Sequence, residues 1–113
     1  MHNTFKVLGD VNRLRIINLL LYEKLCVCEI EESLKMQQTT VSRLLAKLKT
    51  INILHSERNA QWIYYSVSKQ FIKENKYLIK YFEEKFDEDH VYKEDLLRFN
   101  KIKERCTTDT CCK

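Results

Sequence analysis

Proline is absent from the 113-residue chain, and glycine occurs once, at Gly9. These residues are the strongest local breakers of regular structure, so their scarcity predicts helices joined by few tight turns. The first 30 residues also lack a long uncharged run, because charges such as Lys6, Asp10 and Arg13 interrupt the apolar stretches. This pattern excludes a signal peptide and a membrane span there, and we expect a soluble cytoplasmic protein with no membrane partner.

The chain also lacks a large net charge of either sign. The formal net charge is +4, and 44% of the residues are apolar, which is enough for the core of one small domain. The charge is nevertheless uneven. Residues 37–53 carry Arg43, Lys47 and Lys49 and no acid, whereas residues 87–105 mix six acids with five bases. The basic segment is a candidate contact for nucleic acid.

Apolar residues recur at helical spacing through the first half of the chain. The spacing predicts a short helix, a break near Gly9-Asp10 and a second helix to about Tyr22. A short helix from Cys28 to Leu34, a turn at Lys35-Met36-Gln37 and a longer helix from Gln38 to about Ile53 come next. Two helices around a three-residue turn indicate a helix-turn-helix.

After Ile53 the period of the pattern changes from helical to two. Residues Trp62 to Val67 form an aromatic and β-branched alternating run, which is typical of a strand, and Leu54 to Arg58 can pair with it. We expect the hairpin tip at Asn59-Ala60, where Asn tolerates the positive φ that such turns need. This hairpin would be a wing beside the helix-turn-helix.

The helical period returns from Lys69 to Phe86 and gives a wide apolar face. Its two stripes consist of Phe71, Leu78 and Phe82, and of Ile72, Ile79 and Phe86. We expect this face to pack on the first helices and on a second copy of the chain, since it exceeds what one small domain covers. A last helix carries the stripe Tyr92, Leu96, Phe99, Ile102 and Cys106.

The predicted fold class is mostly α with a small β-hairpin (α+β), a winged helix-turn-helix that forms a homodimer through its terminal helices. We expect one domain over residues 1–105, including the dimerisation helices, and a Cys-rich tail over residues 106–113.

The helix that begins at Gln38 has two unlike faces. Its apolar face consists of Val41, Leu44, Leu45 and Leu48, and the opposite face is small, polar and basic. Such a helix can enter the major groove of double-stranded DNA, where Gln and Arg bond base edges and Thr and Ser reach phosphates or thymine methyls. The DNA-binding candidates are Gln38, Thr39, Ser42 and Arg43, with Lys47 and Lys49 as phosphate contacts and Arg58 in the wing. The plainer alternative is a solvated amphipathic helix.

Cysteine is the residue that this chain has in unusual supply. Five occur, an odd number, and a reducing cytoplasm disfavours structural disulfides, so we expect thiols or metal ligands. Cys26-Val27-Cys28 is a close pair. On a regular helix the two side chains would point about 200° apart and could not share an ion, whereas in extended or unwound backbone they point the same way. We therefore expect binding to distort this segment. The alternative is that both are small buried hydrophobes.

The other three, Cys106, Cys111 and Cys112, lie within seven residues of the chain's end. They could lend one sulfur to the Cys26/Cys28 pair or form a three-thiolate site of their own. The alternative is an unstructured tail that happens to be rich in cysteine. Thiolates select soft ions, namely trivalent arsenic and antimony or the divalent metals Cd, Pb and Zn.

Four segments resemble successive motifs of the ArsR/SmtB metal-responsive repressors over residues 5–68. They are Leu14-Arg15-Ile16, Leu25-Cys26-Val27-Cys28-Glu29-Ile30, Thr40-Val41-Ser42-Arg43-Leu44 and Trp62-Ile63-Tyr64-Tyr65. The resemblance implies a winged-helix dimer that represses from operator DNA and leaves it when a metal or arsenical binds cysteine thiolates. The chain departs from the family pattern at Gln37, where Ser is common, and at Ala60, where Gly is common. In the arsenical-sensing branch a third Cys follows the pair, and here that position is Glu31, a poor arsenic ligand.

Three other functions compete with this interpretation. A thiol-redox or persulfide switch would keep the same fold, and a constitutive architectural DNA binder would leave the cysteines incidental. A cysteine enzyme such as an arsenate reductase is disfavoured, since no Cys-x5-Arg or glycine-rich anion cradle surrounds any cysteine. The zinc-sensing branch of the family places a second His after the one at the head of the last helix, and none follows His90.

Overall fold

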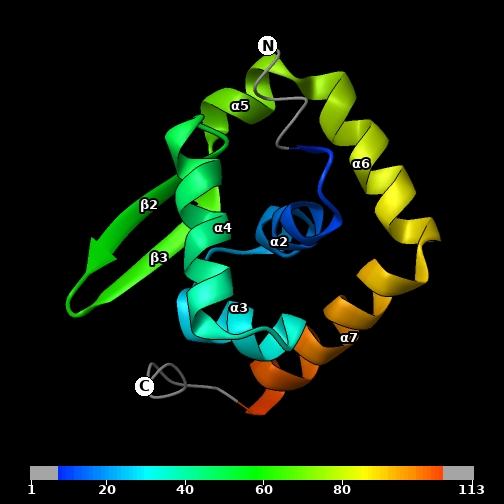
Figure 1. Ribbon diagram of the computed structural model, residues 1–113. Coiled ribbons are helices and arrows are strands. Elements are labelled where there is room, and N and C mark those ends of the chain that lie inside the picture. The colour runs from blue at the N-terminus through cyan, green and yellow to red at the C-terminus, as the bar shows by residue number, and fades with distance from the viewer. Residues whose placement is uncertain (1–7, 106–113) are drawn as a thin grey trace.

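The computed structural model describes residues 8–105. Its elements are α2 (Val11–Tyr22), β1 (Leu25–Cys26), α3 (Val27–Leu34), α4 (Gln38–Thr50), β2 (Leu54–Asn59), β3 (Trp62–Val67), α5 (Lys69–Glu74), α6 (Lys76–Glu88) and α7 (His90–Arg105). Figure 1 shows α2 enclosed by α3, α4, α6 and α7, with the β2–β3 wing projecting to one side. None of the described helices is long and apolar enough to span a lipid bilayer. The helix predicted before Gly9 lies largely outside the described residues.

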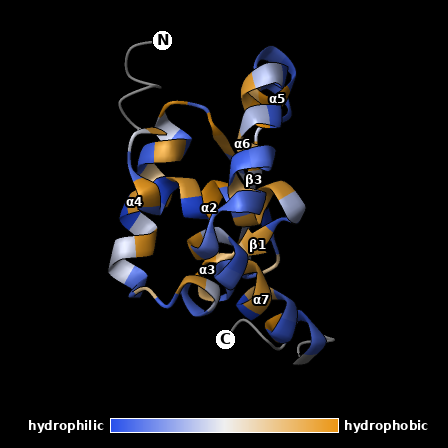
Figure 2. Ribbon diagram, turned by 90° about the vertical axis from the view of Figure 1, so that its right-hand side faces the viewer, coloured by the Kyte–Doolittle hydropathy of each residue, from blue (hydrophilic) through white to orange (hydrophobic). Residues whose placement is uncertain are grey.

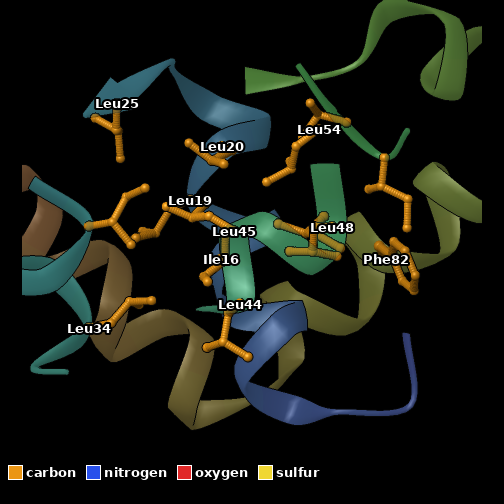
Figure 3. Packing of buried hydrophobic residues seen from close by; sticks show 14 of the residues in the cluster. Ile16, Leu19, Leu20, Leu25, Leu34, Leu44, Leu45, Leu48, Leu54 and Phe82 are labelled. Atoms are coloured by element: carbon orange, nitrogen blue, oxygen red, sulfur yellow. The ribbon is translucent and has the colours of Figure 1, made fainter. Parts of the chain in front are cut away.

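The core forms around α2, which is buried from Ile16 to Leu20. Figure 3 shows Leu44, Leu45 and Leu48 of α4 beside Ile16, Leu19 and Leu20 of α2. These leucines are the apolar face that the sequence predicted, and all three are buried. Packing of this face fixes α4 on the protein, so that its other face points away from the core.

The turn between α3 and α4 lies where the sequence predicted it. Lys35 ends α3 in the left-handed region (φ 56°), and the Met36 N–H donates to the Glu31 carbonyl at 3.1 Å. This C-terminal motif usually uses glycine, so a lysine at this position does not indicate it. Gln37 precedes α4 in extended conformation, and its side chain makes no capping hydrogen bond to a described residue.

Helix α4 stops at Thr50, three residues before the predicted end. Asn52 adopts a positive φ of 65° and donates its N–H to the Lys49 carbonyl, which closes the helix in a tight turn. Ile53 then enters the core as the start of the wing rather than as the last turn of α4.

The three strands form an antiparallel sheet in the order β1-β3-β2. The wing strands match the prediction, and Asn59 pairs with Trp62 in register. The predicted tip was wrong by one residue, because Asn59 still pairs and the positive φ (59°) falls on Ala60. Strand β1 was not predicted. Two residues are too short to show an alternating pattern, and they pair Leu25 with Tyr65 and Cys26 with Tyr64.

The predicted helix over residues 69–86 is two helices separated at Asn75 (φ −130°, ψ 42°). The expectation that its apolar face exceeds what one domain covers was also wrong. Phe71, Ile79 and Phe82 are buried within this protomer, and the large side chains that α6 exposes are Tyr77 and Tyr81. The last helix is confirmed as α7, whose Tyr92, Phe99 and Ile102 are buried, while Cys106 lies outside the described residues.

A substitution at the wing tip tests the observed turn. Ala60→Gly should raise the free energy of unfolding by about 1 kcal/mol, because glycine adopts positive φ without the Cβ clash. The matched variant Asn59→Gly should lower it, since Asn59 is a strand residue. Urea unfolding measures both. If Asn59→Gly stabilises the protein and Ala60→Gly does not, the residue with positive φ is Asn59, as the sequence predicted.

Candidate nucleic-acid interface and cysteine pair

The outer face of α4 is polar, basic and accessible. Gln38, Thr39, Arg43, Lys47 and Lys49 are exposed and Ser42 is half-buried. Figure 2 shows α4 at the edge of the molecule, carrying both hydrophilic and hydrophobic residues. The structure therefore places all six candidates of this helix on one element whose opposite face is anchored in the core. A helix presented in this way can enter a major groove.

The first turn of α4 arranges its polar side chains. The Gln38 amide donates to the Ser42 hydroxyl at 2.7 Å, one helical turn further along. Arg43 follows directly on the exposed surface. No acid occurs in α4, so its surface attracts phosphates along its whole length. Lys47 and Lys49 lie in the last turn, where they also stabilise the carbonyl end of the helix dipole.

The wing adds a cation at its tip. Arg58 is exposed on β2, and its Nε donates to the Ala60 carbonyl at 3.3 Å, which ties the guanidinium to the turn. At the base of the wing, Lys24 forms an ion pair with Glu57 at 2.8 Å. Arg58 is thus the one DNA-binding candidate that the sequence placed outside α4, and its role stays a prediction.

Cys26 and Cys28 lie at the junction of β1 and α3, with their sulfur atoms 3.5 Å apart. Cys26 is the N-cap residue of α3 with extended backbone (φ −89°, ψ 170°), and Cys28 lies in the first turn. Cys26 is therefore not in the helical conformation that would hold the sulfurs apart, because the strand-to-helix change at this residue already brings them together. The distortion of this segment by a bound ion stays a prediction.

The geometry of this pair suits a soft ion. Two thiolates at about 2.3 Å from one tetrahedral metal lie roughly 3.8 Å apart, close to the observed separation. The N-terminus of α3 favours the negative charge of thiolates. Cys26 is buried and Cys28 half-buried. The Cys26 backbone N–H donates to Glu29 Oε1 at 3.1 Å, so the loop that holds the pair is itself fixed.

A groove of about 480 Å³ opens beside the cysteine pair. It is lined by Cys26, Val27, Cys28, Glu31, Gln38, Gln61, Trp62 and Ile63. The groove thus joins the sulfur atoms to the first residue of α4 and to the wing. Among residues 8–105, no group of three His, Cys, Asp or Glu side chains is arranged to hold a metal ion. Cys106, Cys111 and Cys112 lie outside the described residues.

The two described histidines, His55 and His90, do not line this groove. His55 is exposed on β2, and His90 begins α7, where its Nε2 lies 3.0 Å from the Glu94 carboxylate. His90 is 81% exposed, so it is a surface residue at the start of a helix, as its position predicted.

A buried charged cluster was missed by the sequence reasoning. Asp95 of α7 is fully buried and binds Arg15 of α2 through two hydrogen bonds of 2.9 Å, and it also accepts from Arg98. The hydrogen bond to Asp95 raises the pKa of Arg15 above its ordinary value. A signal was present. Asp95 falls on the apolar stripe between Tyr92 and Phe99, where an acid needs a partner.

The chain is similar to known regulators. Residues 10–56 match the family model described as "Bacterial regulatory protein, arsR family". The arsenic resistance transcriptional regulator ArsR1 of Pseudomonas putida is 44% identical over 62 residues, which are 54% of this chain and 48% of that protein. The cadmium resistance regulatory protein CadC of Listeria innocua is 37% identical over 56% of this chain and 54% of that protein. The chain thus matches about half the length of these two relatives.

A shorter relative is covered more fully. An HTH-type transcriptional regulator of Methanocaldococcus jannaschii is 37% identical over 62% of this chain and 80% of that protein. Among solved structures, reduced HlyU from Vibrio cholerae is 27% identical over 68% of this chain and 81% of that chain, with a TM-score of 0.60. The homodimeric winged helix-turn-helix domain of Mb0332 from Mycobacterium bovis (24% identity, 74% and 77% coverage, TM-score 0.65) shares the fold. With its helix-turn-helix, wing and Cys26/Cys28 motif, the chain belongs to the ArsR/SmtB family of DNA-binding transcriptional regulators.

Proposed function

We propose that this regulator represses transcription by binding double-stranded operator DNA through α4 and the wing, and that it releases the operator when a thiophilic inducer binds Cys26 and Cys28. The observation that carries the proposal is the 3.5 Å sulfur pair in a groove that also holds Gln38, the first residue of α4. Because the family consists of transcriptional regulators, the cysteine-enzyme alternative falls away.

The inducer class follows from the donor set. Two sulfurs this close favour trivalent arsenic or antimony, or a soft divalent metal such as Cd, Pb or Zn. The relatives named for arsenic and cadmium resistance support the same range. We propose that Cys106, Cys111 or Cys112 supplies a further sulfur, since arsenic in its trivalent state binds three. Glu31 also lines the groove, but its hard carboxylate suits arsenic poorly.

Release would start at the N-terminus of α3. An ion that binds Cys26, Cys28 and a third sulfur exerts a force on Cys26, the residue where β1 ends and α3 begins. Helix α3 leads through a short turn into α4, so a change in its direction moves the DNA-reading helix. The inducer shifts the population because it binds the released arrangement more tightly than the operator-bound one.

A second candidate is a redox switch on the same fold, in which cysteines form a disulfide or persulfide bridge. The short sulfur separation favours it as well, since a modest movement would allow a bond to form. Thiol titration with and without oxidant, compared with arsenite titration, distinguishes the two switches.

We also propose that the protein acts as a homodimer. Tyr77 is 88% exposed and Tyr81 54% exposed, both on α6, and Val11 of α2 is exposed too. Large aromatic side chains in water are typical of interfaces. The similar domain from M. bovis is described as homodimeric.

Replacement of Tyr77 and Tyr81 together by Glu should convert the dimer to a monomer, because it buries like charges in the proposed interface. Sedimentation at micromolar concentration measures the change. The control Asn59→Glu, at an exposed polar residue of the wing, should leave the dimer intact. A wild-type monomer, or a dimer that tolerates the double substitution, contradicts the proposed interface.

Arg43→Ala should weaken operator binding by about 1–3 kcal/mol and relax sequence preference if the guanidinium bonds a base edge. Lys49→Ala should weaken binding to every DNA sequence to a similar degree, as expected for loss of a phosphate contact. Binding is measured on a duplex that the protein selects from a random library and on unselected DNA. An equal loss on both duplexes for Arg43→Ala would make Arg43 a phosphate contact.

Cys26→Ser with Cys28→Ser should keep operator binding and abolish release by arsenite, antimonite or cadmium, because serine keeps the size and removes the soft ligand. Release of labelled operator is measured by fluorescence anisotropy. The matched variant replaces Cys106, Cys111 and Cys112. If that variant alone stops responding while the first responds normally, sensing belongs to the tail and the Cys26/Cys28 pair is core packing.

A further inference from the structure

The C-terminal end of α3 is bound by two arginines, Arg15 of α2 and Arg98 of α7. Arg15 donates to the Leu34 carbonyl at 3.0 Å, and Arg98 donates to the Ser33 carbonyl at 2.7 Å. These carbonyls belong to the last turn of α3, where no following turn of helix supplies an N–H donor to them. Both guanidinium groups are held by the fully buried Asp95. We name Arg15, Asp95 and Arg98 the C-terminal contact.

The same helix also holds the opposite end of α3. Lys103 Nζ lies 3.5 Å from Glu29 Oε2, and the other oxygen of that carboxylate accepts the Cys26 backbone N–H. Lys103 also pairs with Glu23 at 3.0 Å. The Glu29 side chain thus bridges Lys103 of α7 and the backbone of Cys26, the residue that carries the first sulfur. We name the Lys103–Glu29 ion pair the N-terminal contact.

The two contacts are spaced to match. Arg98 and Lys103 are five residues apart on α7, about 7.5 Å along the axis, and their partners Ser33 and Glu29 are four residues apart on α3, about 6 Å. The helices therefore run antiparallel and are joined at both ends. The contacts are unequal, because Asp95 is fully buried whereas the Lys103 side chain is 35% exposed. A partly exposed ion pair opens more easily than a buried, doubly paired carboxylate.

We propose that Glu29 and Lys103 are positioning residues for the switch: the N-terminal contact holds α3 in the operator-binding arrangement, and inducer binding at Cys26 and Cys28 opens it while α3 turns about the C-terminal contact. This inference rests on the proposed function. It identifies α7 as the element against which α3 moves. It also explains how a change at Cys26 becomes a change of angle at the turn before α4.

The test compares four single variants, and the double variant Glu29→Gln/Lys103→Met, with the wild type. Glu29→Gln keeps an oxygen for the Cys26 N–H and removes the charge that Lys103 needs, and Lys103→Met removes the cation. Lys103→Arg keeps the pair. Lys101→Met removes the same charge from an exposed residue two positions away on α7 and serves as the matched control. Operator affinity without inducer and the arsenite concentration for half-release are measured for each, with thermal unfolding alongside.

Glu29→Gln and Lys103→Met should each weaken inducer-free operator binding and lower the half-release concentration, by about threefold to fivefold, the range that a partly exposed ion pair supports. The double variant should go no further than Lys103→Met, since that substitution already breaks the contact with Glu29 together with the Glu23 pair. Lys103→Arg should behave like the wild type, and Lys101→Met should show neither change.

Two results would overturn the inference. If Glu29→Gln and Lys103→Met shift half-release in opposite directions, the two charges tune the sulfur pair electrostatically and hold no helix in place. If both match Lys101→Met in operator affinity, the contact does not position α3. Failure of arsenite and cadmium to release the wild type would instead refute the proposed inducer, and the inducer-free affinities would still decide on the contact.

Discussion

The buried carboxylate of Asp95 is the interaction on which the arrangement of this protein depends. It pairs with both Arg15 and Arg98, and these two side chains in turn donate to the carbonyls that end α3. Removing one partner of such a buried group generally costs about 3–5 kcal/mol, because the others keep uncompensated charge. Three segments distant in sequence, α2, the end of α3 and α7, are thereby fixed at one point. The helix-turn-helix is therefore held by polar contacts behind it as well as by its leucine core.

This fixed point explains why the turn into α4 tolerates an unfavourable residue. Lys35 adopts a left-handed conformation that glycine would take more readily. Because Arg15 and Arg98 bind the Leu34 and Ser33 carbonyls from the other side, the direction in which α3 ends is set independently of Lys35. The surrounding structure pays for the local strain, and the angle between α3 and α4 is thereby maintained.

Much of the fold could be predicted from the sequence because its signals are periodic. The leucine face of α4 and the alternating β3 strand each repeat over enough residues to reveal their partners. The errors in the predicted element boundaries fall where the backbone angles of a single residue end or bend an element. Asn52, Ala60 and Asn75 end or bend elements through backbone angles that no pattern announces. The surplus apolar face over residues 69–86 was misjudged because a sequence shows how wide a face is and not how much of the protomer covers it.

The cysteine pair was found from its spacing, but its geometry was not, and the reason lies in β1. Cys26 pairs with Tyr64 of β3 while it caps α3, so a two-residue strand sets the extended angles that bring both sulfurs to one side. The same pairing ties the sulfur pair to the wing, and α3 ties it to α4. A movement of Cys26 must therefore disturb β3, α3 or both. Since β3 is also paired to β2 along its full length, the helix side is the one that yields more easily. This asymmetry directs the effect of an ion at the sulfurs toward α3 and the DNA-reading helix that follows it.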